Sequence, residues 1–502
     1  MLYALASTPS LVHGLADAST AMASRKSPLR WAGDSEGGAP FIYQSSTDAS
    51  KTIGCEVELM QAIADKLGQK SVFVQNSWDG LIPGLKRGNY DAAINAIEIT
   101  PDRAKVVAFS QSYYVTYEQF TVRQGSPDVS SLKDCKGKVV GTYRRAVAER
   151  LLETAGGIEV RLYDNVEPIY RDLLNKRLDA VLLDYPLALY CGSPLPGLRF
   201  SGEPVSRIEY GIAVRPEDVK LLAEINTALD GLKKEGKLRE IFERWGLWTP
   251  MMADRLHDTS PSRIRPTAWQ AYLASRDALS NWKDKARAYI SYLPLLVKGA
   301  GVTLGLSVLG MTLAMILGLS LTLTKLYGPA PGRWLATSYI ELFRGTPLLI
   351  QLFILFYGLP YLGIKLPPFA AAVLGLGLNY AAYEAENYRA GILSVAKGQM
   401  EAAQVLGFSR AQALRLIILP QALRLSLPPV TNDFVSILKD SSLVSVITIV
   451  ELTKVYGQLA SATYDWMGLG LLTAGMYFLV GWPFVLLARR LELKLNPGRR
   501  SS

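Results

Sequence analysis

The feature that most constrains the fold is a set of long, charge-free apolar stretches in the second half of the chain. A helix that crosses a bilayer core needs roughly 17–25 mostly apolar residues. Up to about residue 290, short apolar runs alternate with charges, as they do in a soluble α/β domain. The sequence therefore predicts a soluble half followed by a membrane half. The stretches without Asp, Glu, Lys or Arg are Gly299–Thr324, Gly345–Ile364, Leu366–Tyr383 and Trp466–Ala488.

Basic residues outside these stretches indicate the orientation of the membrane half. Cytoplasmic loops carry an excess of Lys and Arg. If the first span, near 295–324, enters from outside, the outer loops hold only Lys365 and Lys454. The inner loops and tail then hold Lys325, Arg333, Lys397, Arg410, Arg415, Arg424, Arg489, Arg490, Lys494, Arg499 and Arg500. An odd number of spans is needed to place the soluble half outside and the basic tail inside, so we predict a fifth span within about 425–450. The net charge of +10 lies largely on these loops, which argues against a nucleic-acid partner.

The soluble half alternates strand and helix patterns from Leu29 onward. LRWAGD, SVFVQ and YDAAIN read as strands, and apolar residues at helical spacing lie between the first two. The same rhythm resumes at KVVGTY, followed by an expected helix over Ala146–Ala155 and the strand LDAVLLD. Repeated βαβ units predict parallel sheets that bind ligands at the carboxyl ends of their strands.

Two stretches make this half resemble the polar amino-acid binding proteins of bacteria, the family 3 type of periplasmic binding protein. They are SWDGLIPGLKRGNYDAAINAIEITPDRAKVVAFSQSYY and, later, LDAVLLDYPLA with IEYGIAVRPED and LKKEGKLREIFERWG. The resemblance implies a two-lobed α/β domain over 28–248, with one lobe at 28–118 and 207–248 and the other at 119–206. Crossover strands near 118–123 and 207–214 would join the lobes.

The resemblance also implies a substrate site. Arg103 in TPDRAK matches the arginine that holds the α-carboxylate of the ligand, since a guanidinium makes two parallel charge-assisted bonds. Asp184 in VLLDY matches the carboxylate that receives the α-ammonium. Trp78 matches an aromatic residue that packs on the ligand side chain. Asp34, Glu98 and Ala96 complete the expected site. The alternatives are a surface arginine, a helix N-cap and a core tryptophan.

Several positions depart from the family pattern. Relatives usually have a small hydroxyl residue where this chain has Glu98, and a loop like QGTT where it has Arg144-Arg145-Ala146-Val147. Glu98 and Asp34 favour a cationic ligand side chain, whereas the two arginines favour an anionic one. The sequence therefore leaves the amino acid open, and a binding domain that has lost its affinity stays an alternative.

The segment Glu401–Pro420, EAAQVLGFSRAQALRLIILP, resembles the cytoplasmic coupling loop of binding-protein-dependent ABC import permeases. The residues that carry the pattern are Glu401, Ala402, Ala403, Gly407, Ile417, Leu419 and Pro420. We expect a short helix, a turn at Gly407 and a second helix that Pro420 ends. The two alanines would let a partner approach closely. The alternative is an ordinary amphipathic loop.

Flanking segments such as YIELFRGTPLLIQLF extend the resemblance to permeases for polar amino acids over 291–493, the type I ABC permease fold. Charges inside a span are costly and suggest function or pairing. Glu386 and Arg389, three residues apart, can pair on one helical face. Together with Lys439 they are candidates for the translocation path.

The chain does not contain an ATP-binding motif of its own. The near-match Gly231–Lys237 is followed by Leu238 instead of Ser or Thr. The resemblance therefore implies separate ATPase subunits on the cytoplasmic face, which bind ATP and Mg²⁺, and a second permease subunit, expected to be an identical copy. With His13 and His257 as its two histidines and Cys55, Cys135 and Cys191 as its cysteines, the chain offers neither a zinc spacing nor a disulfide framework, and we expect free thiols.

The predicted organisation has five parts. Residues 1–27 have no basic start, so we interpret them either as a degenerate leader or as a stretch whose true start lies upstream. The binding domain at 28–248 is followed by a linker at 249–290 with an amphipathic helix over Thr267–Arg287, the permease at 291–493 and a tail at 494–502. The predicted function is the substrate-binding and membrane-translocating subunit of an ABC importer for polar or charged L-amino acids. The alternatives are a ligand-gated channel and a permease with a degenerate regulatory binding domain.

Overall fold

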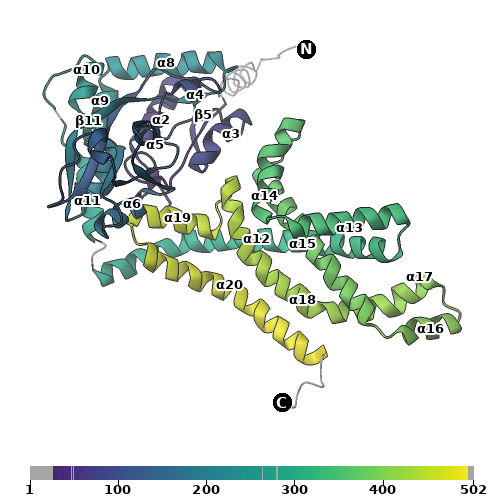
Figure 1. The fold of residues 1–502 in the computed structure, drawn as a ribbon. Helices are drawn as coiled ribbons and strands as arrows, with labels where there is room; N and C mark the ends of the chain where they lie inside the picture. The colour runs from purple at the N-terminus through teal and green to yellow at the C-terminus, as the bar shows by residue number, and fades with distance from the viewer. Residues whose placement is uncertain (1–26, 47, 49, 263, 279–280, 496–502) are drawn as a thin grey trace, which may run out of the picture.

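The computed structural model describes residues 27–46, 48, 50–262, 264–278 and 281–495. A two-lobed α/β part lies against one end of an extended all-helical part, as Figure 1 shows. This arrangement agrees with the fold expected from the sequence. The expected leader falls on residues outside the described ones.

The first lobe is built on a five-stranded sheet in the order β4-β1-β5-β12-β6. Strand β1 runs parallel to its two neighbours, β4 and β5, with Trp31 opposite Phe73. This parallel order follows from the crossover helix α2 (Cys55–Leu67), which buries Leu59 and Ile63 against the sheet and ends at Gly68 with a φ of 63°. The strands are β1 (Leu29–Gly33), β4 (Ser71–Gln75), β5 (Ala92–Ala93), β6 (Ala108–Phe109) and β12 (Ala213–Val214).

The second lobe is built on a sheet in the order β11-β7-β10-β8-β9. Its two longest strands, β7 and β11, pair antiparallel and carry the chain from one lobe to the other and back. Helices α5 (Val147–Ala155) and α6 (Val166–Leu174) supply the parallel crossovers. The strands are β7 (Tyr114–Arg123), β8 (Val139–Tyr143), β9 (Glu159–Tyr163), β10 (Ala180–Asp184) and β11 (Leu198–Tyr210).

The segment expected to be a linker is folded onto the binding domain. The expected single helix over Thr267–Arg287 is wrong, because α11 (Thr267–Ala278) ends before α12 (Trp282–Tyr327) begins. The reason is tertiary packing: Tyr272 on α11 is buried, its hydroxyl donates to the carbonyl oxygen of Tyr190 at 3.0 Å, and the centres of the two rings lie 4.8 Å apart. The amphipathic pattern thus continues into a helix that enters the membrane part.

Two helices among the described residues are long and apolar enough to cross a membrane, Trp282–Tyr327 and Trp466–Leu491. A third span results if Ala330–Gly345 and Leu348–Leu362, which meet at 107°, are counted together. The other two expected spans lie on α15 (Pro368–Ser394) and α18 (Leu419–Asp440), whose internal charges lower their apolarity. The count of five spans therefore stays a prediction.

Small residues let the two central helices of the membrane part approach closely. On α12, a Cβ added at Gly318 would lie 2.7 Å from the Cβ of Glu384 and 3.0 Å from the carbonyl oxygen of Ala381. In a bilayer, where apolar burial does not drive helices together, such contacts favour association. The close pair α12 and α15 forms the frame on which α13 (Ala330–Gly345), α18 and α20 (Trp466–Leu495) pack.

Candidate functional site

The cleft between the lobes holds a cavity of about 50 Å³, too small for an amino acid in this closed arrangement. Its walls bring together five of the six residues that the sequence indicates for substrate binding, and the sixth, Arg103, lies beside it. The five are Asp34, Trp78, Ala96, Glu98 and Asp184. Phe41 and Tyr143 add further aromatic surface.

Arg103 lies on the short helix α4 (Pro101–Ala104), whose N-cap is the side chain of Thr100. Its guanidinium forms an ion pair with the carboxylate of Glu98 and also donates to the carbonyl oxygen of Glu98 at 3.1 Å. Across the cleft, its other terminal nitrogen donates to the carbonyl oxygen of Arg145 at 3.0 Å. The guanidinium carbon lies 5.6 Å from the ring centre of Trp78. The expected carboxylate-binding arginine is therefore already occupied.

Glu98 supplies the carboxylate that Arg103 holds. Its side chain belongs to the first lobe, and its Oε1 accepts a hydrogen bond of 2.8 Å from the backbone N–H of Val147, the first residue of α5 in the second lobe. The residue is 3% exposed. Glu98 thus joins the two lobes through a buried charge.

Asp184 lies at the end of β10 and accepts a hydrogen bond from the hydroxyl of Tyr210. Burial, with a further contribution from Glu98, raises the pKa of Asp184 to about 6. Glu118 lies opposite Asp184 in the β7–β10 ladder, and burial next to Asp184 raises its pKa well above the ordinary value. The sequence reading did not find Glu118, although a carboxylate in the apolar strand YVTYEQFTVR was a usable signal.

Asp34 has a positioning role in this structure. Its carboxylate accepts hydrogen bonds from the backbone N–H groups of Trp78 and Glu36, at 2.9 and 3.0 Å, and from the side chain of Gln75 at 3.0 Å. It therefore fixes the loop that carries Trp78. Ala96 has a φ of 51°, and its N–H donates to the buried carboxylate of Glu56 at 2.7 Å.

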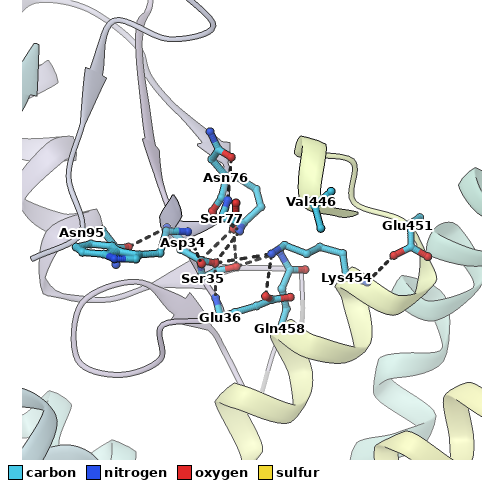
Figure 2. Close-up of polar contacts among 12 residues, drawn as sticks. Asp34, Ser35, Glu36, Asn76, Ser77, Asn95, Val446, Glu451, Lys454 and Gln458 are labelled. Carbon is cyan, nitrogen blue, oxygen red and sulfur yellow. Dashed lines mark hydrogen bonds and ion pairs between the residues drawn. The ribbon is translucent and has the colours of Figure 1, made fainter. Parts of the chain in front are cut away.

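A contact that no motif indicated joins the binding domain to the membrane part. Figure 2 shows Lys454 of α19 (Leu452–Thr463) extending toward Asp34 and Glu36. Its Nζ lies 2.8 Å from a Glu36 carboxylate oxygen and 3.9 Å from one of Asp34. Gln458, one turn further on, donates to the hydroxyl of Ser35 at 3.0 Å. Lys454 is 5% exposed, so this is a buried charge contact between the two parts.

Further contacts extend this docking surface. Arg87 of the first lobe lies over the ring of Phe356, with 3.9 Å between its guanidinium carbon and the ring centre, and donates to the carbonyl oxygen of Leu366. The hydroxyl of Tyr292 donates to the carbonyl oxygen of Ser46 at 2.9 Å. Between the parts lies a chamber of about 650 Å³, whose walls include Trp78 and Tyr143 of the binding domain and Tyr357, Lys454 and Tyr456 of the membrane part.

The segment that resembles a coupling loop lies at the far end of the membrane part from the binding domain, around α16 and α17 in Figure 1. Helix α16 (Lys397–Val405) ends before a turn at Gly407, whose φ is 86°, and a Ser409–Gln412 capping box starts α17 (Arg410–Ala413). Glu401 and Ala402 are exposed. Val405 and Leu406 are 87% and 76% exposed, so this apolar edge has no partner among the residues that the structure describes.

Two details of the expected loop are wrong. Ala403 is buried inside the chain, so only Ala402 of the alanine pair faces outward. Pro420 does not end the second helix. It lies in the first turn of α18, where a missing N–H costs little, after a π-helical turn at Leu414–Ile418. Ile417 and Leu419 are half-buried on either side of that junction.

Three of the intramembrane charges form one cluster around Glu386. Arg389 donates to Glu386 at 2.8 Å, as the spacing predicted, and Lys325 of α12 donates to the other oxygen of Glu386 at 2.7 Å. Lys439 is exposed on α18. The three cysteines are free thiols and buried. Within the described part of the chain, no group of His, Cys, Asp or Glu could hold a metal ion.

Comparison with known proteins covers both parts. Residues 31–247 match the model of bacterial extracellular solute-binding proteins, family 3, and residues 308–497 match that of binding-protein-dependent transport system inner membrane components. The probable amino-acid ABC transporter permease protein YckA of Bacillus subtilis is 42% identical over 191 residues, which are 38% of this chain and 84% of that protein. The arginine transport system permease protein ArtQ of Bacillus subtilis is 35% identical over 210 residues, 42% of this chain and 96% of that protein. An ancestral arginine-binding protein bound to glutamine is 34% identical, with a TM-score of 0.41, over 45% of this chain and 100% of that one.

The two family-model matches, with a two-lobed domain docked on apolar helices, define the class as a membrane transport protein with its own solute-binding domain. The chain belongs to the family of ABC transporter permeases that depend on binding proteins. It is an inner-membrane protein whose binding domain is extracytoplasmic.

Proposed function

We propose that this protein is the receptor and permease of an ABC importer for polar or charged L-amino acids. The fused domain captures the amino acid in its cleft and passes it to the membrane part on which it is docked. Relatives of the membrane part are named as amino-acid permeases, which supports this substrate class.

The observation that carries the proposal is the buried contact of Lys454 with Glu36 and Asp34. An isolated lysine is rarely buried, because losing hydration is costly unless a carboxylate replaces it. This lysine comes from the membrane part and reaches the loop that, through Asp34, holds Trp78 at the cleft. The contact therefore connects the permease with the proposed ligand site directly.

The chamber between the two parts supports a route for the ligand. Trp78 and Tyr143 line both the cleft cavity and the 650 Å³ chamber, so a ligand that leaves the cleft past these rings enters the chamber. On the permease side, Tyr357, Lys454 and Tyr456 receive it. Glu386, Arg389 and Lys439 are further candidates for the path through the membrane.

In the loaded cleft, Arg103 binds the α-carboxylate and Asp184 the α-ammonium, while Trp78 packs on the side chain. Asp34 positions Trp78. Glu98 and Ala96 line the same cavity. Once the lobes open, a carboxylate of the ligand can replace that of Glu98 at Arg103, since a guanidinium binds either one with the same geometry.

The energy for import comes from ATP hydrolysis by partner subunits. The exposed residues Glu401, Ala402, Val405 and Leu406 provide a polar and apolar surface for an ABC ATPase subunit that binds ATP and Mg²⁺. Such an ATPase works as a pair, and a second copy of this chain would complete the permease.

A second candidate function is a permease regulated by a binding domain that no longer binds an amino acid. The ion pair of Glu98 with Arg103 favours it, because the carboxylate-binding arginine is occupied from within the domain.

Ligand binding by the full chain in lipid nanodiscs distinguishes the two candidates. A ligand at a hundredfold excess over its dissociation constant stabilises its receptor by about 2.7 kcal/mol. We expect one or a few of the twenty amino acids to raise the melting temperature of the chain, and Asp184→Asn to remove that rise. No rise with any amino acid would refute the receptor role and support the regulatory one.

A further inference from the structure

A carboxylate of the protein itself lies between the two lobes. The carboxylate of Glu98 pairs with the guanidinium of Arg103 on one side and accepts the N–H of Val147 at 2.8 Å on the other. Val147 opens α5, a nine-residue helix, so the amide belongs to a helix N-terminus. An arginine fork and a helix N-terminal amide that face each other are a combination suited to a carboxylate.

This arrangement leaves few hydrogen-bond donors and little space for a second carboxylate. The other terminal nitrogen of Arg103 donates to the carbonyl oxygen of Arg145, and Glu98 is 3% exposed. A ligand carboxylate that enters must therefore take over the guanidinium of Arg103 and the N–H of Val147 from Glu98. The displaced Glu98 cannot stay in the cleft without cost, because Asp184 and Glu118 lie close enough to interact with it electrostatically.

We propose that Glu98 is a built-in competitor for the carboxylate of the ligand. In the empty domain it occupies the subsite and joins the lobes, and an amino acid binds only after it has displaced this side chain. The inference rests on the proposed function, since it assumes that the ligand carries a carboxylate at Arg103. The apparent affinity for the ligand equals the intrinsic affinity multiplied by the fraction of time for which Glu98 leaves the subsite free.

The consequence is selectivity against carboxylates. A ligand that lacks a carboxylate does not compete with Glu98, and its ammonium can still reach Asp184 among the rings of Phe41, Trp78 and Tyr143. Glu98 then even serves as the missing carboxylate for such an amine. Removing Glu98 should therefore raise the affinity for an amino acid and should not raise the affinity for the corresponding amine.

The test compares L-arginine with agmatine, its decarboxylated form, by calorimetry on the full chain in nanodiscs. Glu98→Thr introduces a small hydroxyl residue, and Glu98→Gln keeps the size but removes the charge. If Glu98 fills the subsite 90–99% of the time, Glu98→Thr should bind L-arginine about 10- to 100-fold more tightly. Glu98→Gln should also bind it more tightly, and the affinity of Glu98→Thr for agmatine should not increase.

Asp102→Asn is the matched control. Asp102 faces Arg150 of the second lobe at 3.7 Å, but both side chains are exposed, so the change removes an inter-lobe charge pair without touching the subsite. It should leave both affinities unchanged. Equal or weaker binding of L-arginine by Glu98→Thr would overturn the proposal, and so would an equal gain for agmatine, which would indicate a merely enlarged pocket. Failure of the import function has a different signature: ATP-dependent uptake would be absent from parent and variant alike, whatever their affinities.

Discussion

Replacing Lys454 with methionine should release the binding domain from the permease. Lys454 is 5% exposed and lies 2.8 Å from Glu36, whose side chain is 25% exposed, and 3.9 Å from the buried Asp34. Its loss leaves both carboxylates without their cation. Removing one partner of a buried pair costs about 3–5 kcal/mol. Burial already raises the pKa of Glu36 to about 7, so proton uptake by this carboxyl reduces the cost. We expect a loss of about 3 kcal/mol near pH 7.5, a shift of roughly 100-fold in the docking equilibrium.

The docked fraction can be measured by energy transfer between dyes on Glu203→Cys in the binding domain and Tyr361→Cys in the membrane part. Both positions are exposed, and the three natural cysteines are buried. Full chains in nanodiscs should show high transfer with Lys454 present and low, broadly distributed transfer with Lys454→Met.

Two controls complete the experiment. Lys365→Met makes the same change at an exposed lysine of the membrane part and should have no effect. Glu36→Gln added to Lys454→Met removes the unpaired charge and should restore much of the transfer. Unchanged transfer in Lys454→Met alone would refute the reasoning that this pair holds the two parts together.

Three further perturbations test the site and the coupling surface. Arg103→Ala should abolish amino-acid binding while the melting temperature of the ligand-free chain stays within a few degrees of the parent; retained affinity measured by calorimetry would remove Arg103 from the site. Glu401→Lys should leave ligand binding intact and uncouple uptake from ATPase turnover, because the residue is exposed on α16; unchanged transport would contradict the coupling role. Asp184 should make binding pH-dependent. Its pKa is raised from 3.8 to about 6, so in the empty domain it contributes stability that is complete below 3.8 and lost as the pH rises through about 6. A ligand ammonium needs the ionised form, so affinity should fall by up to about tenfold per pH unit below 6, and Asp184→Asn should show no such slope.

The sequence predicted what local pattern determines. The βαβ rhythm gave the strands and crossover helices of both lobes, because apolar spacing differs between strand and helix. The resemblance to amino-acid-binding proteins indicated Trp78 and Asp184, which line one cavity, and Arg103, which lies beside it.

What the sequence did not predict depends on contacts between distant segments. Lys454 and Glu36 are far apart along the chain, and nothing in either local pattern indicates that they meet. Glu98 was recognisable as an unusual residue, but its contact with Val147 depends on how the two lobes face each other. The break between α11 and α12 has the same origin, because Tyr272 packs on the binding domain while α12 continues into the membrane part.

The segment that resembles a coupling loop contains one prediction that the structure confirms and one that is wrong. Gly407 turns the chain as predicted, because a φ of 86° suits glycine. Pro420 was expected to end a helix, but a proline is compatible with a first turn as well as with a stop. Only the fold decides between the two.

The most direct test of the account is uptake into proteoliposomes that contain this chain and its ABC ATPase, with no soluble binding protein added. The account predicts ATP-dependent accumulation of the labelled amino acid identified by thermal shift, lost with Arg103→Ala and reduced with Lys454→Met. Uptake that begins only after a separate solute-binding protein is added outside, and that is insensitive to both substitutions, would contradict the claim that the fused domain delivers the substrate.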